Sequence, residues 1–200
     1  MKTYDRAYFD RWYRDPKLAV ATQESVARKV HLVVSIAESL LLRRVRSVLD
    51  IGCGEATWRA PLKKLRPGIR YVGVDSSEYV IARYGGRRGI RRGTFGGLGE
   101  IERSLRGRFD VVVCCDMLQY IPADDLRAGL ASVAALLGGV AYLEAYTSGD
   151  SIEGDRRGWH NRSAAQYRRA FHTAGLTSVG MHCWVGAVLR TAAAELERAT

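Results

Sequence analysis

With 200 residues, of which 47% are hydrophobic and 26% charged, the chain can form one domain with a substantial core and is too short for two ordinary ones. The net charge of +10, mostly from arginine, leaves contact with nucleic acid open. No apolar run approaches about 18 residues and the first residues are charged and aromatic, so we expect neither a membrane span nor a signal peptide. The cysteines fit neither a disulfide framework nor a zinc site, so we expect a cytoplasmic protein with reduced thiols and no metal.

Aromatic residues are concentrated near the N-terminus, in the stretch YDRAYFDRWYRD. Tyr4, Tyr8 and Trp12 recur at steps of four, which places them on one face of a helix. Such a stripe either packs into the core or folds over a binding site as a lid, and the sequence leaves both open. Residues 17–43 follow with apolar positions at steps of three and four, which predicts a long amphipathic helix. We therefore treat residues 1–44 as an N-terminal helical and aromatic segment.

The remainder, residues 45–200, alternates short apolar segments with segments of helical length. The apolar segments are rich in β-branched residues without polar alternation, which is typical of parallel strands covered on both faces. These expected strands are residues 47–51, 70–75, 109–115 and 138–146, with expected helices at 56–65, 76–85 and 123–138 between them. The order predicts a single α/β domain with a Rossmann-like, doubly wound, mostly parallel sheet and helices on both faces.

The C-terminal part continues the pattern less clearly. Residues 163–175 have helical spacing, and residues 176–185 read as one strand. The tail, residues 191–200, is rich in helix-forming residues, which predicts a last helix. No further strand is evident.

The stretch DIGCGEATW, residues 50–58, lies at the carboxyl end of the first expected strand, where open α/β sheets bind ligands. Thr57 stands where the dinucleotide fingerprint has its third glycine, which argues against a pyrophosphate. The Asp50 carboxylate suits a ligand with positive charge, such as the sulfonium and ammonium groups of S-adenosylmethionine. Asp75 closes the second strand and can accept both hydroxyls of an adenosine ribose. The turn therefore predicts a nucleoside ligand without phosphates.

An ordered set of motifs resembles the class I S-adenosylmethionine-dependent methyltransferases, over residues 45–185. VLDIGCGEA resembles the first motif of that family, with Ala56 in the place of its last glycine, and YVGVDSS resembles the ribose-binding second motif. FDVVVCCDMLQYIP, GGVAYLEAYT and FHTAGLTSVGM resemble the later strand motifs. The resemblance implies methyl transfer from S-adenosylmethionine. The cofactor-binding residues that we expect are Asp50, Gly52, Cys53, Gly54, Asp75, Ser76, Phe95, Gly96, Cys115, Asp116 and Met117.

The chain departs from the family pattern in three places. The acid that often meets the adenine amine after the third strand is missing from RRGTFGGLGEI. The seventh, antiparallel strand of the family is not evident near the C-terminus. CDMLQY stands where enzymes that methylate amino groups of bases and glutamines have N-P-P-Y, which argues against methylation of a nucleobase amine.

The acceptor side is expected around the segment SGDSIEGDRRGWHNR, residues 148–162. Structureless connections of this length tend to be functional or disordered, so the segment either walls an acceptor pocket or is a mobile surface loop. His160 is the first candidate for a general base, because it is the histidine on a loop near the expected site. Tyr146 and Tyr120 are the next candidates. The sulfonium already activates its methyl group, so the protein mainly has to align donor and acceptor.

These observations predict a methyltransferase that acts on a small-molecule acceptor. One alternative is an RNA methyltransferase that grips phosphates with GGRRGIRRG, residues 85–93, although this cluster also reads as a solvated turn before an edge strand. A second alternative is a protein that binds S-adenosylmethionine without turnover. The sequence names neither the acceptor nor the oligomeric state.

Overall fold

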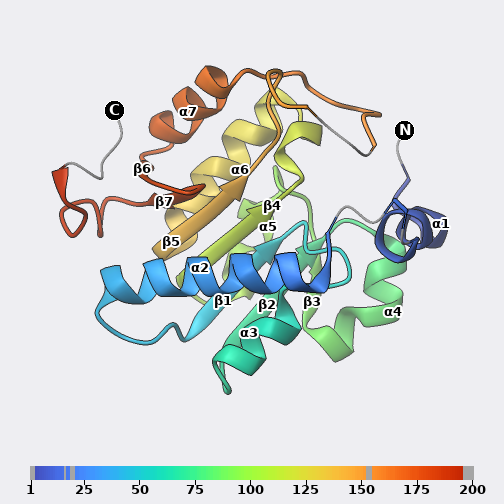
Figure 1. Ribbon diagram of the computed structural model, residues 1–200, viewed down its shortest axis with the longest axis horizontal. Helices are drawn as coiled ribbons and strands as arrows, with labels where there is room; N and C mark the ends of the chain where they lie inside the picture. The colour runs from blue at the N-terminus through green and yellow to red at the C-terminus, as the bar shows by residue number, and fades with distance from the viewer. Residues whose placement is uncertain (1–2, 16, 19–20, 152–154, 196–200) are drawn as a thin grey trace.

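The computed structural model describes residues 3–15, 17–18, 21–151 and 155–195. Its centre is a seven-stranded sheet in the order β3-β2-β1-β4-β5-β7-β6 (Figure 1). The first five strands in this order run parallel, whereas β7 is antiparallel to both β5 and β6. The strands are β1 Ser47–Ile51, β2 Arg70–Asp75, β3 Ile90–Arg92, β4 Phe109–Cys115, β5 Leu137–Glu144, β6 Thr177–Gly180 and β7 Cys183–Val185. The expected doubly wound, mostly parallel sheet is confirmed.

Helices cover both faces of the sheet, and the alternation of side chains along β4 shows how the core divides. Val111 and Val113 pack into a hydrophobic cluster with residues of α2, α3 and α4, whereas Val112 and Cys114 pack into a second cluster under α5, α6 and α7. The helices are α1 Arg6–Phe9, α2 Gln23–Leu41, α3 Arg59–Leu65, α4 Glu78–Arg88, α5 Leu98–Leu105, α6 Ala123–Leu136 and α7 Ala164–Thr173. A π-helical turn, Asp10–Arg14, continues α1, and a 3-10 turn, Leu118–Tyr120, follows β4.

The C-terminal strand differs from its prediction. Residues 176–185 were expected as one strand, but β6 and β7 form an antiparallel hairpin. Met181 and His182 connect them with φ angles of 49° and 61°, the left-handed conformation that a two-residue hairpin turn requires. Neither residue type signals such a turn, which is why the sequence hid it. The hairpin also supplies the seventh strand that the sequence did not show.

Helix ends differ from the expected ranges as well. The helix expected at 17–43 begins only at Gln23, because Thr22 caps it by accepting a hydrogen bond from Ser25 N. Part of the arginine cluster expected as a turn, Gly85–Arg88, is the last turn of α4, and the edge strand β3 follows it.

The last helix predicted for the tail is not seen in its described part: residues 191–195 form no α-helix, and residues 196–200 lie outside the described residues. Over the described residues, no helix has the length and apolar character needed to cross a membrane.

Candidate functional site

The glycine turn after β1 is built so closely that side chains are excluded from it. Gly52 and Gly54 have φ angles of 67° and 50°, which favour glycine. A Cβ atom at Gly52 would lie 2.2 Å from the sulfur of Met117, and one at Gly54 would lie 2.6 Å from the Tyr13 hydroxyl. Ala56, in the position that the sequence compared with a third glycine, also has a positive φ of 60°. The turn therefore presents bare backbone at the carboxyl end of the sheet.

Asp75 fixes this turn to the end of β2. One carboxylate oxygen accepts a hydrogen bond from Gly54 N at 2.7 Å, and the other accepts one from Ser77 N at 2.8 Å. Burial raises the pKa of Asp75, and the backbone N–H donors oppose that rise. A carboxylate offers roughly four acceptor positions, so these two bonds leave positions for a ligand's hydroxyl groups.

Asp50 lies below the turn rather than in the pocket. Its side chain is 3% exposed and accepts a hydrogen bond of 2.6 Å from the Tyr71 hydroxyl. Burial raises the pKa of Asp50 to about 7, the Tyr71 hydrogen bond lowers it, and the nearby charge of Asp75 raises it further. Cys53, the residue between the two glycines, is buried in the core on the same side.

The end of β4 supplies the next group of expected residues, Cys115, Asp116 and Met117. Asp116 has a φ of 54°, a left-handed conformation that is uncommon for residues other than glycine and is often found at functional sites. Its backbone N–H donates to the Glu144 carbonyl at 3.0 Å, and its side chain accepts from Gln119 Nε2 at 2.6 Å. The chain is thus turned and held where β4 leaves the sheet.

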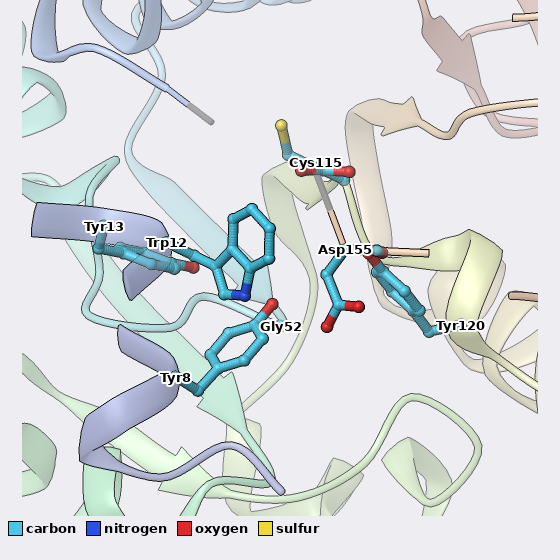
Figure 2. A pocket seen from close by; sticks show the side chains of 8 residues that line it. Tyr8, Trp12, Tyr13, Gly52, Cys115, Tyr120 and Asp155 are labelled. Atoms are coloured by element: carbon cyan, nitrogen blue, oxygen red, sulfur yellow. The ribbon is translucent and has the colours of Figure 1, made fainter. Parts of the chain in front are cut away.

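A pocket opens between the glycine turn and the end of β4, and it encloses about 440 Å³ when its solvent-open part is counted. Figure 2 shows Tyr8, Trp12 and Tyr13 on one side, with Tyr120 and Asp155 across from them. The lining residues are Tyr8, Trp12, Tyr13, Gly52, Cys115, Asp116, Tyr120 and Asp155.

The N-terminal aromatic segment is anchored over this site by contacts outside the pocket. Phe9 is 2% exposed and stacks on Tyr79 with ring centroids 5.6 Å apart. Arg14 forms an ion pair with Glu55 of the glycine turn. The Ser77 hydroxyl donates a hydrogen bond of 2.5 Å to the Tyr4 carbonyl. Of the aromatic stripe, Tyr4 and Tyr8 pack against the core, and Tyr8 and Trp12 also line the pocket.

Across the pocket lies Asp155, which begins the described part, residues 155–162, of the expected acceptor segment. The Tyr120 hydroxyl donates to the Asp155 carbonyl at 2.6 Å, and His160 N donates to the Gln119 carbonyl at 2.8 Å. Arg162 donates to the Ile121 carbonyl at 2.6 Å. These bonds dock the segment onto residues 118–121. The segment as far as it is described is therefore held against the end of β4.

The three candidate catalytic residues occupy different places. Tyr120 lines the pocket, and Tyr146 stacks on Trp159 with centroids 6.3 Å apart. The His160 side chain is exposed and is not part of the pocket lining. Burial raises the pKa of Tyr120 to about 12, and the charges of Asp116 and Asp155 contribute to that rise. Its hydroxyl is therefore neutral near pH 7 and acts as a hydrogen-bond donor.

The remaining expected cofactor residues lie outside the lined pocket. Ser76 is exposed at the end of β2. Phe95 is 2% exposed and packs so closely on Gly129 that a Cβ atom there would lie 2.1 Å from the ring. Gly96 faces Asp125 at the start of α6. Phe95 and Gly96 thus lie after the end of β3 and contact helix α6.

A partly buried polar cluster beside Cys115 was not found from the sequence. Glu144, at the end of β5, accepts two hydrogen bonds from Lys29 Nζ, at 2.7 and 2.8 Å, and one from the Tyr142 hydroxyl at 2.8 Å. Cys115 Sγ lies 3.0 Å from the same carboxylate. Burial would raise the pKa of Glu144, but these donors lower it on balance. Because Lys29 belongs to α2, no local pattern signals this cluster.

Comparisons with known proteins agree with this geometry. Residues 49–140 match the family model described as a methyltransferase domain. No curated protein sequence matches the chain. DesVI of Streptomyces venezuelae superposes with a TM-score of 0.63 at 18% identity, over 82% of this chain and 92% of that one. Magnesium protoporphyrin IX methyltransferase from Synechocystis PCC 6803, with bound S-adenosylmethionine, gives a TM-score of 0.54 at 22% identity, over 86% and 82%.

A third solved structure is similar over a comparable part of the chain. The plantazolicin methyltransferase BamL, in complex with a desmethyl plantazolicin analogue and the demethylated cofactor, superposes with a TM-score of 0.62. It is 16% identical over 86% of this chain and 76% of that one. At these identities the structures show the shared class I methyltransferase fold, and the family model covers the strands that build the glycine turn and the end of β4.

Proposed function

Since the chain is an S-adenosylmethionine-dependent methyltransferase with its methyltransferase domain at residues 49–140, we propose that it methylates a small molecule bound in the pocket at the glycine turn. The observation that carries this proposal is the enclosure of the pocket. Tyr8, Trp12 and Tyr13 of the N-terminal segment line it from one side and Tyr120 and Asp155 from the other, which suits a small acceptor better than a folded macromolecule.

The residues present fit the cofactor. Gly52 and Gly54 keep side chains away from the turn, and Asp75 retains acceptor positions for ribose hydroxyls. The positive φ of Asp116 directs the chain away from the sheet next to Gly52. When bound, S-adenosylmethionine supplies an activated methyl group. We propose that Ser76, Phe95 and Gly96 shape the adenosine end of the same site, as the motif resemblance implies.

The contribution of the protein to the reaction is then mainly alignment and exclusion of water. Holding two reactants in line replaces a bimolecular encounter, which contributes up to roughly 7–11 kcal/mol in favourable cases. We assign Tyr120 a positioning role, because its hydroxyl holds the Asp155 backbone and is neutral near pH 7. His160 and Tyr146 remain proposed candidates for a base that serves an acceptor with a proton to lose.

We also propose that residues 4–14 act as a lid. Tyr8, Trp12 and Tyr13 line the pocket, and the segment is attached to the core through Phe9 and Arg14. Closure by this segment would separate the reacting groups from water. In this division, residues 1–44 form the covering segment and residues 45–200 form the cofactor-binding core.

The arginine cluster supports a small acceptor over RNA. Arg88 donates to the Glu55 carbonyl and lies 4.0 Å over the Tyr84 ring. Arg91 donates to the Ser104 carbonyl at 2.5 Å, and Arg92 forms an ion pair with Glu78. These side chains thus bind their own domain.

We place the activity in the cytoplasm, because all four cysteines are free, as expected in a reducing compartment.

The test is methyl transfer from labelled S-adenosylmethionine to fractionated small metabolites and, in parallel, to total RNA. We expect label in a small-molecule fraction, and none in that fraction with a variant whose Asp75 is replaced by alanine. Transfer to RNA alone would contradict the proposal. Cofactor binding without transfer to any fraction would favour a binding protein without turnover.

A further inference from the structure

Asp75, the proposed ribose ligand, is screened from the open pocket. It is 9% exposed, and the described lining of the pocket does not include it. Its carboxylate is held by the backbone N–H groups of Gly54 and Ser77, and both of these residues contact the N-terminal segment. Tyr13 approaches Gly54, and the Ser77 hydroxyl donates to the Tyr4 carbonyl. The space around Asp75 is therefore covered in part by this segment.

The closest contact of the segment with the glycine turn is made by the Tyr13 hydroxyl. A Cβ atom built on Gly54 would lie 2.6 Å from this oxygen and 3.3 Å from a ring carbon of Phe9. The distance of 2.6 Å is shorter than the roughly 3.5–4.0 Å at which nonbonded carbon atoms pack. The Tyr13 hydroxyl thus fills the space beside the bare backbone, where a glycine would otherwise let a ligand approach closely.

The electrostatic surroundings of Tyr13 agree with a hydroxyl that lies near the Asp75 carboxylate. Burial raises the pKa of Tyr13 well above its ordinary value, and Tyr8 and the charges of Asp75 and Asp116 raise it further. The hydroxyl is therefore protonated near pH 7. A neutral phenol presents the same kind of O–H group as a ribose hydroxyl does.

Tyr13 can leave the turn without disturbing the core. It is 36% exposed and belongs to neither of the two hydrophobic clusters of the described residues. It lies in the π-helical turn Asp10–Arg14, between the buried Phe9 and Arg14, which is paired with Glu55. The Tyr13 side chain can therefore swing away while these two neighbours keep the segment attached.

We propose that Tyr13 is an intramolecular competitor of the cofactor: its phenol fills the space beside Gly54 and has to leave before a ribose binds Asp75. This inference rests on the proposed ribose role of Asp75 and extends the proposed lid, since the segment first has to open and then covers the bound cofactor. Such a competitor lowers the apparent affinity in proportion to the fraction of molecules in which it has left the site.

The experiment measures association and dissociation rates of S-adenosylhomocysteine by stopped-flow fluorescence. Tyr13→Ala clears Gly54 and leaves Phe9 and Arg14 in place. We expect association about ten-fold faster, as for a competent state populated at about 10% in the wild type, and dissociation within about two-fold of the wild-type rate. Tyr13→Phe removes the hydroxyl and keeps the ring, so it should fall between.

Arg11→Ala is the matched control. It shortens an exposed side chain of the same π-helical turn, one that lies over the Trp12 ring, and it leaves Tyr13 whole. We expect this variant to associate at the wild-type rate, because Gly54 stays covered.

The direction of the change separates a competitor from a residue that holds the bound cofactor. Unchanged or slower association in Tyr13→Ala would overturn the proposal, and so would equal acceleration in Tyr13→Ala and Arg11→Ala. Failure of the ribose assignment itself would look different, since Asp75→Asn would then bind S-adenosylhomocysteine as tightly as the wild type.

Discussion

At the scale of single residues, Asp75 combines two roles, because the carboxylate proposed to bind the ribose also holds the glycine turn. Its side chain is 9% exposed and accepts from Gly54 N and Ser77 N. Removing it would leave two N–H groups without their partner, which costs roughly 1–3 kcal/mol for each buried group. The position of Asp75 at a strand end would by itself suggest that its replacement has little effect on stability. Its two backbone hydrogen bonds predict that replacement lowers both stability and cofactor affinity.

Asp75→Ala should therefore weaken cofactor binding by about ten- to several-hundred-fold and also lower the melting temperature. Asp75→Asn keeps one acceptor oxygen, so it should lose less of both. Calorimetry with S-adenosylhomocysteine measures affinity, and thermal denaturation of the same samples measures stability. A stable Asp75→Asn protein that binds the cofactor as tightly as the wild type would contradict the ribose assignment.

Asp50 predicts a pH dependence of stability. Its pKa is raised to about 7 in the folded protein, above the ordinary value of 3.8, mainly by burial. Between about pH 4 and pH 7 the unfolded chain ionises this group while the folded chain keeps its proton, so stability falls as pH rises. Asp50→Asn removes the titration and can keep a hydrogen bond to Tyr71. We expect its melting temperature to rise relative to wild type from pH 4.5 to pH 7.5; a constant difference would refute the assignment.

At the scale of elements, the sequence predicts those parts that depend on local pattern. The apolar strands and the glycine turn follow from residue type and spacing, and the strand-end positions of Asp75 and Asp116 place them at one edge of the sheet. The hairpin was missed because Met181 and His182 do not signal a left-handed turn. Asp155 was missed because its place in the pocket depends on tertiary contacts, such as the bond from the Tyr120 hydroxyl to its carbonyl, and no sequence pattern records them.

The segment 148–162 provides a prediction at this scale. If it walls the acceptor pocket, replacing it by a tight turn should abolish methyl transfer while the cofactor affinity stays within a few fold. Tyr120→Phe is the milder variant, because it keeps the ring and removes the hydroxyl that donates to the Asp155 carbonyl. A bond of about 1 kcal/mol corresponds to a loss of about five-fold in kcat/KM. Parallel loss of S-adenosylhomocysteine binding would instead assign the segment to the cofactor site.

At the scale of the whole molecule, the net charge of +10 does not describe the site. Arg14, Arg88 and Arg92 bind acidic side chains or carbonyl groups of the same domain, and the pocket itself is lined by carboxylates. Composition alone leaves a nucleic-acid partner open, whereas the structure shows that these arginines bind groups of their own domain and that two acidic residues line the pocket.

The division of the chain into a covering N-terminal segment and a cofactor-binding core predicts the effect of deleting the first residues. Deleting residues 1–15 removes Tyr8, Trp12 and Tyr13 from the pocket, and it also removes Phe9, whose burial contributes roughly 1.5–3 kcal/mol. Because α2 and the sheet keep their own cluster, the shortened protein should still fold, with a lower melting temperature. We expect S-adenosylhomocysteine to dissociate at least about ten-fold faster, as measured by stopped-flow displacement, because nothing covers the turn. Phe9→Ala, which weakens the anchor and leaves the pocket residues in place, is the matched variant and should fall between. If both proteins release the ligand at the wild-type rate, the segment serves only as part of the core and residues 4–14 are not a lid.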